Sequence, residues 1–281
     1  MTPADRYEAL GSGLSRGALL AYSIAIFAFI LAPIIVITVG SFASTLYLSF
    51  PPQNLSLRWY HELGQESRWA IAAWNTLKIG VPVALISVVL GTLVALGMVR
   101  SRSRAIEVLG IGFIAPMMLP HIIIAIGLYP TIVDFGLANT YLAVVIGHVV
   151  VSAPFVVLTV TASLRDYPET LEMAAMTLGA NRWRTFWRVT FPMIRHGIGV
   201  GGLFAFATSF DELMLSLFLT GPETETLPRL IWEHLFYTLT PVVAAASTFI
   251  LAFSIVLILL AVFIRQGAVE STEVSGGARK S

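Results

Sequence analysis

Long apolar stretches alternate with short charged ones along most of this chain, and the charged residues mark where the stretches end. No charged residue occurs between Arg16 and Arg58, although Pro51 and Pro52 predict that a helix ends before them. An apolar helix needs about 20 residues to cross a bilayer. The pattern therefore predicts six membrane-spanning helices, at about 17–46, 79–99, 108–133, 135–164, 197–220 and 241–264.

Two adjacent carboxylates, Asp211 and Glu212, interrupt the fifth predicted helix. A helix that starts near His196 would carry Asp211 roughly 22 Å along its axis, past the middle of a bilayer about 30 Å thick. An ionised side chain there is costly unless it meets water or a partner. Three interpretations stay open: a site for a cationic substrate, structural pairs with a neighbouring helix, and a helix that bends near the outer surface. One division of roles has Asp211 facing the pore while Glu212 pairs with a basic group or caps a break in the helix.

The composition agrees with a membrane protein and narrows its class. Hydrophobic residues make up 57% of the 281 residues, charged residues only 12%, and the mean hydropathy is +0.83. An ordinary soluble protein has about 25% charged residues. We therefore predict an all-α integral membrane protein with six transmembrane helices. The net charge of +1 gives no reason to expect a nucleic-acid partner, and the absence of cysteine excludes disulfides.

Basic residues are unevenly shared between the two sides of the predicted membrane protein. With six spans, only four of the 17 basic residues fall on the side away from the termini: Arg58, Arg68, Lys78 and Arg229. Because basic loops stay in the cytoplasm, both termini should be cytoplasmic. Residues 1–16 are then a cytoplasmic N-terminal segment, 17–264 a six-helix transmembrane domain, and the Gly- and Ser-containing residues 265–281 a flexible cytoplasmic tail. Trp59, Tyr60 and Trp69 suit anchoring at the outer membrane interface.

Sequence signals for enzyme chemistry are missing. Neither lysine, Lys78 or Lys280, follows a glycine, so no phosphate-binding P-loop is possible. The "HELGQ" stretch at 61–65 lacks the second histidine of a zinc-binding helix. His121 and His148 lie in predicted spans, where either proton relay or packed hydrogen bonding would explain them. We expect no catalytic residue, metal or cofactor on this chain.

The loop at about 165–195 has the features of a protein-docking element. A first short helix should start after Pro168, with Glu169 and Glu172 in its first turns, and should end at Gly179. Asn181 can cap a second helix that is rich in Arg and Trp. That second helix could instead lie on lipid headgroups. The short, Ala-rich first helix favours docking to a protein.

This loop resembles the EAA loop in the membrane subunits of type I ABC importers. The resemblance rests on Ala174-Ala175, Gly179 and Pro192 at the family spacing, while Met173 stands in the Glu position and Glu172 precedes it. It implies a type I importer permease fold and two cytoplasmic ATPase subunits, which would use ATP and Mg²⁺ and dock on the loop. The residues implied in ATPase coupling are Glu172, Ala174, Ala175, Gly179, Arg182 and Pro192.

The later segment "TSFDELMLSLFLTGPETETLPRLIW" is similar to the permease subunits of spermidine/putrescine importers. That resemblance covers most of the chain. It implies a bacterial inner-membrane protein that forms half of a translocation path with a second, homologous permease. An external solute-binding protein would deliver polyamines such as putrescine or spermidine. ATP hydrolysis would belong to the partner chains.

The residues of a substrate path are hypotheses at this point. Asp211 and Glu212 are the first candidates, and Trp74, Tyr129 and Asp134 are possible neighbours. Alternatives are a permease for another small solute, amino-acid-like or anionic, a proton-coupled secondary transporter, or a non-transporting scaffold. Gly197 and Gly201 have the spacing of a helix-packing motif.

Overall fold

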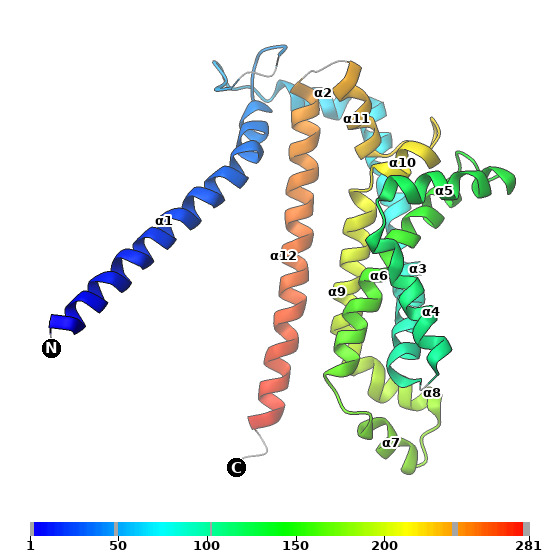
Figure 1. Ribbon diagram of the computed structural model, residues 1–281. Helices are drawn as coiled ribbons and strands as arrows, with labels where there is room; N and C mark the ends of the chain where they lie inside the picture. The colour runs from blue at the N-terminus through cyan, green and yellow to red at the C-terminus, as the bar shows by residue number, and fades with distance from the viewer. Residues whose placement is uncertain (1–2, 48–49, 102, 238–240, 278–281) are drawn as a thin grey trace. The chain divides into compact units, whose positions relative to one another are not determined.

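Figure 1 shows the computed structural model of the chain, which describes residues 3–47, 50–101, 103–237 and 241–277. Among these residues the regular structure is helical, with one isolated antiparallel bridge between Ala43 and Leu55. The helical elements are α1 (Pro3–Gly40), α2 (Arg58–Gln65), α3 (Ser67–Arg100), α4 (Arg104–Ile114), the 3-10 turn η1 (Ala115–Met118), α5 (His121–Asp134), α6 (Tyr141–Arg165), α7 (Thr170–Thr177), α8 (Arg182–Thr185), the π-helical turn η2 (Phe186–Thr190), α9 (Phe191–Phe210), α10 (Met214–Leu219), α11 (Leu227–Tyr237) and α12 (Pro241–Gly277). The predicted all-α class is confirmed.

The chain forms two compact units, residues 1–65 with 234–249 and residues 66–233 with 250–281. In the first unit, the chain turns back after α1. The indole N–H of Trp59 donates to the carbonyl oxygen of Ala43 at 2.7 Å, and the hydroxyls of Ser41 and Tyr60 lie 2.7 Å apart. Trp59 is buried, as is Trp69 in the second unit. The predicted interfacial anchoring is therefore wrong for these two rings, which pack inside the protein.

Helices α3, α6 and α9 form the core of the second unit, and α6 and α9 approach each other closely. A Cβ atom on Gly201 would lie 2.9 Å from Cα of Val156, and one on Gly197 would lie 2.9 Å from the carbonyl oxygen of Thr159. Only glycine permits such contact between two helix backbones. The predicted packing role of Gly197 and Gly201 is confirmed. The core around this contact includes Ala95, Val156, Val157, Val160, Leu164, Ile194 and Ala205.

The third predicted span, 108–133, is not one straight helix. Residues Arg104–Met118 and His121–Asp134 form two helical segments bent by 113°. Pro120 lies in the break and Pro116 in η1 just before it, and each lacks a backbone N–H to donate within a helix. In the described residues, five helices are long and apolar enough to cross a membrane, or six if this bent pair counts as one span.

The other predicted spans agree with the structure in position but differ at their ends. Helix α3 begins at Ser67, well before the predicted start at residue 79, and α9 ends at Phe210, so the predicted interruption of the fifth span at Asp211 is confirmed. Helix α12 continues to Gly277, through most of the segment that the sequence predicts to be a flexible tail. Residues 278–281 lie outside the described part of the chain.

Candidate functional site

The loop at 165–195 contains the two predicted short helices, α7 and α8. Gly179 has φ of +92°, a left-handed conformation that suits glycine after the end of α7. The side chain of Asn181 accepts a hydrogen bond of 2.8 Å from the backbone N–H of Arg184 and so caps α8. The sequence therefore predicts both turns of this loop correctly. Figure 1 shows α7 and α8 at one end of the second unit.

Glu172 fastens the loop to the rest of its own chain. Its Oε1 accepts hydrogen bonds from Arg100 Nη2 at 3.1 Å, from the Tyr167 hydroxyl at 2.5 Å and from Thr190 Oγ1 at 3.1 Å. Burial by itself would raise the pKa of Glu172, but the hydrogen bonds from Tyr167 and Arg100 outweigh it and hold the pKa below its usual value. This carboxylate therefore stays charged and ties α7 to the end of α3 and to η2.

Four large apolar side chains in α7 and the residue that follows it are exposed to the surroundings. Leu178 is 90% exposed and Met173, in the Glu position of the family pattern, is 50% exposed. Arg182 and Pro192 are exposed as well, Ala174 is exposed, and Ala175 is half-buried. We call the exposed apolar residues Leu171, Met173, Met176 and Leu178 the α7 patch. Exposed apolar patches occur at protein and at membrane interaction sites.

The segment Asp211–Leu213 separates α9 from α10, and we call it the α9–α10 break. Glu212 is buried, with its residue 5% exposed, and Oε2 lies 2.6 Å from Nδ1 of His121. Its Oε1 accepts a hydrogen bond of 3.1 Å from the backbone N–H of Leu215, in the first turn of α10. Glu212 thus takes both structural roles considered from the sequence. Asp211 is exposed and, within the described chain, its carboxylate has no hydrogen bond or ion pair.

The other three predicted path residues lie on α3 and α5. Trp74 is on α3 next to Lys78, whose Nζ is 5.9 Å from the ring centroid. Tyr129 is on α5, and Asp134 is the last residue of that helix. All three are exposed, and in the described residues no hydrogen bond or ion pair joins any of them to Asp211. Within the described residues, the structure joins none of these three candidates to Asp211 by a polar contact.

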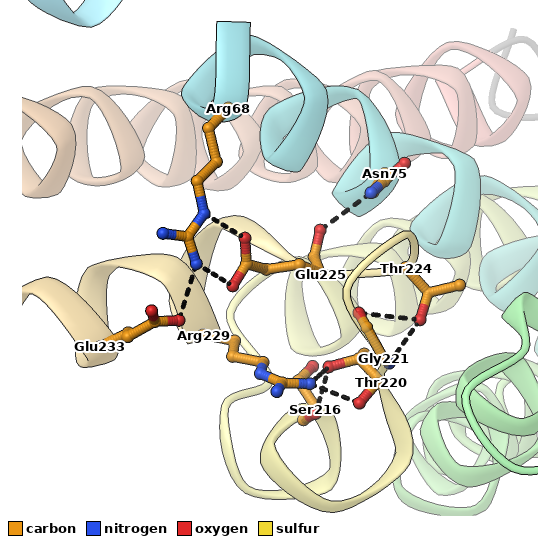
Figure 2. Close-up of polar contacts among 9 residues, drawn as sticks. All are labelled: Arg68, Asn75, Ser216, Thr220, Gly221, Thr224, Glu225, Arg229 and Glu233. Carbon is orange, nitrogen blue, oxygen red and sulfur yellow. Dashed lines mark hydrogen bonds and ion pairs between the residues drawn. The ribbon is translucent and has the colours of Figure 1, made fainter. Parts of the chain in front are cut away.

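A polar network that the sequence analysis missed joins the beginning of α3 to the 220–226 loop and α11 (Figure 2). Arg68 contacts Glu225 at 3.0 Å and Glu233 at 2.8 Å, and its hydrogen bond lowers the pKa of Glu233. Asn75 Nδ2 donates to the carbonyl oxygens of Glu223 and Glu225, both at 3.0 Å. The charged run "ETETLPR" was the available signal, but its partners lie about 150 residues earlier in the chain.

A second arginine completes the network at the end of α10. Arg229 donates through Nη1 to the carbonyl oxygen and to the hydroxyl of Thr220, the residue that follows α10 (Figure 2). A cation at this end complements the negative end of a helix dipole. The 220–226 loop is therefore held on both sides, by Arg229 from α11 and by Arg68 and Asn75 from α3.

Comparisons with known proteins agree with these features. Residues 87–271 match the family described as "Binding-protein-dependent transport system inner membrane component". The putrescine transport system permease protein PotI of Escherichia coli strain K12 is 30% identical over 236 residues, 80% of this chain and 82% of that protein. The spermidine/putrescine transport system permease protein PotC of Shigella flexneri is 28% identical over 253 residues, 90% of this chain and 94% of that protein.

Solved structures show the same fold. A chain from a bacterial ABC transporter involved in the import of the acidic polysaccharide alginate has a TM-score of 0.69, at 16% identity, over 95% of this chain and 99% of that one. A chain from the MetNI methionine ABC transporter has a TM-score of 0.55 at 18% identity, over 72% of this chain and 94% of that one.

The matched residues 87–271 include α6, the loop with the α7 patch and the α9–α10 break, whereas Arg68 and Asn75 of the polar network lie before them. Residues 87–271 make up well over half of the chain, and the match to PotI extends over four fifths of it. This chain belongs to the family of binding-protein-dependent transport system inner membrane components.

Proposed function

We propose that this chain is the membrane subunit of an ATP-driven importer for small cationic amines of the putrescine and spermidine class. The relatives PotI and PotC carry these amines in their names. The observation in the structure that carries the proposal is the exposed carboxylate of Asp211 at a break in a membrane span. Both carboxylate oxygens of its neighbour Glu212 already have partners within the chain, at His121 and at the start of α10.

An amine needs an anionic or aromatic partner when it leaves water, because an isolated ammonium is costly in an apolar environment. Asp211 can supply that charge, since no group of the described chain neutralises it. A break in a helix also exposes backbone polar groups, which membrane proteins tolerate where the chain lines a wet cavity. We infer that Asp211 faces the translocation path.

The α7 patch is the proposed docking surface for a cytoplasmic ATPase. Ala174 and Ala175 are small enough for close approach, and Leu178 and Met173 offer apolar area for burial. Glu172 holds this helix against α3 and η2, so that force on α7 reaches a long helix of the core. ATP and Mg²⁺ would be bound and used by that ATPase.

The full transporter in this proposal has a second, homologous permease, two ATPase subunits and an external solute-binding protein. The excess of basic residues on the side of the 165–195 loop supports a cytoplasmic position for that loop and for both termini. The 220–226 loop and its Arg68–Glu225–Glu233 network would then lie outside, at the bacterial inner membrane.

The competing functions differ in what they require. Membership of a binding-protein-dependent family favours an importer over a proton-coupled secondary transporter. A permease for an amino-acid-like or anionic solute shares the fold, as the alginate transporter illustrates. An anionic substrate would be repelled by Asp211, and this charge is the reason to prefer an amine.

The test is ATP-dependent uptake of labelled putrescine and spermidine into vesicles that contain the complete transporter and its binding protein. Asp211→Asn keeps the size of the side chain and removes its charge. We expect amine uptake to fall by about tenfold or more, because a charge-assisted contact of this kind is worth about 1.5–3 kcal/mol. Basal ATP hydrolysis and subunit assembly should persist.

Glu223→Gln is the matched control, since Glu223 is another exposed carboxylate and only its backbone carbonyl takes part in the network. Its uptake should equal that of the wild type. Wild-type uptake by Asp211→Asn would remove Asp211 from the path. If the wild type hydrolyses ATP but transports neither amine, the importer stands and the amine assignment fails.

A further inference from the structure

The α9–α10 break is held by two histidines from other helices, although a break of three residues could leave α10 free to turn. His148 comes from the first half of α6 and His121 is the first residue of α5. Each contacts one or more residues at or beside the break, within the second unit. Asp211, the residue of the proposed amine path, stands at the start of this break.

The ring of His148 bridges the two sides of the break. It is fully buried, with Nδ1 2.9 Å from Ser209 Oγ in the last turn of α9 and Nε2 3.3 Å from Ser216 Oγ in the first turn of α10. The Ser216 hydroxyl also donates to the carbonyl oxygen of Glu212 at 2.7 Å. One imidazole therefore connects the end of one helix to the beginning of the next.

The hydrogen-bond donors around His148 assign its tautomer. A serine hydroxyl has one proton, and that of Ser216 is used at the carbonyl of Glu212. The contact of Nε2 with Ser216 is a hydrogen bond in the tautomer with the proton on Nε2, and in that tautomer Nδ1 accepts the hydroxyl proton of Ser209. Both nitrogens of a neutral ring are satisfied. This arrangement fits a structural tie and leaves no free nitrogen on His148 for proton relay.

His121 holds the break from α5. Its Nδ1 contacts the buried carboxylate of Glu212, whose second oxygen caps α10 through the N–H of Leu215. His121 directly follows Pro120, at the bend between η1 and α5. The contact therefore joins the break in one span to the bend in another.

We propose that His121 and His148 are positioning residues, which fix the α9–α10 break and with it the placement of Asp211 in the amine path. The inference rests on the proposed role of Asp211. The N–H of Asp211 bonds to the carbonyl oxygen of Ala207 in α9, and the next residue is Glu212, which both histidine networks reach. A backbone rotation at Glu212 would therefore move Asp211, and the contacts of the two histidines oppose that rotation.

The natural chain contains no cysteine, which permits a direct test of this placement. Asp211→Cys introduces the one thiol of the chain, and its reaction rate with a cationic methanethiosulfonate reagent reports access to residue 211 in the complete transporter. The rate on this chain is measured by mass spectrometry in four backgrounds: native, His121→Leu, His121→Asn and His148→Leu. Glu223→Cys, exposed on the 220–226 loop, is the matched control position.

We expect His121→Leu and His148→Leu each to change the thiol rate of Asp211→Cys by about tenfold. Each variant removes the hydrogen bonds of one imidazole to the break, and the loss of one such bond shifts an equilibrium by about this factor. His121→Asn keeps a nitrogen near the place of Nδ1 and should stay within about threefold of the native rate. The rate of Glu223→Cys should be the same in all backgrounds. Unchanged rates of Asp211→Cys in both leucine backgrounds would overturn the proposal.

If His148→Leu does not assemble, Ser209→Ala and Ser216→Ala remove its two partners without emptying its volume, and the same change in the thiol rate of Asp211→Cys is expected. The thiol rate requires no transport, so the two proposals fail separately. If the thiol rates change in the histidine variants but Asp211→Asn takes up amines normally, the histidines are positioning residues and Asp211 has no role in amine transport. If Asp211→Asn loses uptake but the thiol rates do not change, Asp211 keeps its role and the histidines are not positioning residues.

Discussion

Glu172 lies on the side of α7 that faces its own chain, while Met173, the next residue, is half exposed. Adjacent residues on a helix point about 100° apart, which explains the difference. In the family pattern the Glu stands where this chain has Met173. Glu172 therefore stabilises the loop from within, and the α7 patch remains available for a partner.

Replacing Glu172 with Gln should lower the thermal midpoint of the purified protein at pH 7 by about 3 °C, through loss of charge-assisted hydrogen bonds. Because the pKa of Glu172 is depressed in the folded protein, its carboxylate stabilises the fold above its unfolded pKa. That contribution is lost as the pH falls through the folded pKa. The difference between wild type and variant should thus shrink below about pH 4 in thermal unfolding experiments in detergent.

Glu169→Gln is the control, because Glu169 is exposed at the start of the same helix and has no ion pair in the described residues. Its midpoint should follow the wild type at every pH. A Glu172→Gln difference that stays constant as the pH is lowered through the folded pKa would contradict the assigned charge on this carboxylate.

For single residues, the sequence predicts some roles but not the distant partners that fulfil them. The spacing around Asp211 and Glu212 indicates two carboxylates with separate roles, and Glu212 has both roles that were considered for it. Its partner His121 could not be predicted, because 91 residues separate the two and only the folded chain brings them together. Ser209 and Ser216 give no sequence signal at all for binding His148.

At the scale of helices, the apolar pattern predicts where spans lie but not which of them break. Prolines do not decide this: Pro33, Pro82, Pro130 and Pro154 all lie inside continuous helices. Membrane helices tolerate proline where neighbours satisfy the freed backbone groups. The third span bends where Pro116 and Pro120 follow each other closely, and the fifth breaks at charged residues without proline.

The packing of α9 on α6 gives a prediction at this scale. Gly201→Ala should destabilise the protein by about 1–3 kcal/mol, because the added Cβ would overlap Thr159 Oγ1 and lie 2.9 Å from Cα of Val156. Gly112→Ala is the control, since a Cβ on that α4 glycine meets no atom within 4 Å. The control should be neutral or stabilise by up to about 1 kcal/mol. Thermal unfolding in detergent measures both, and equal losses would disprove the close helix contact.

In the second unit as a whole, α3 connects two polar networks. Arg68, near its beginning, pairs with Glu225 and Glu233, and Arg100, at its end, pairs with Glu172 of the 165–195 loop. A helix of 34 residues is about 50 Å long, enough to join the two surfaces of a membrane. A movement of α7 imposed by an ATPase would thus act directly on a helix that also holds the 220–226 loop.

The proposed assembly can be tested at the α7 patch. Leu178→Glu should reduce co-purification of the ATPase subunits by about tenfold or more, because it places a charge at the most exposed apolar position of the proposed interface.

The matched control is Leu57→Glu, at a leucine that is 56% exposed in the segment before α2, on the proposed outer side. Fold and membrane insertion should be unchanged in both variants, because neither side chain is buried. Loss of the ATPase from both variants would indicate general misfolding, whereas its retention by Leu178→Glu would move the docking surface away from α7. Loss from Leu178→Glu alone would assign to α7 the contact through which ATP hydrolysis drives α3.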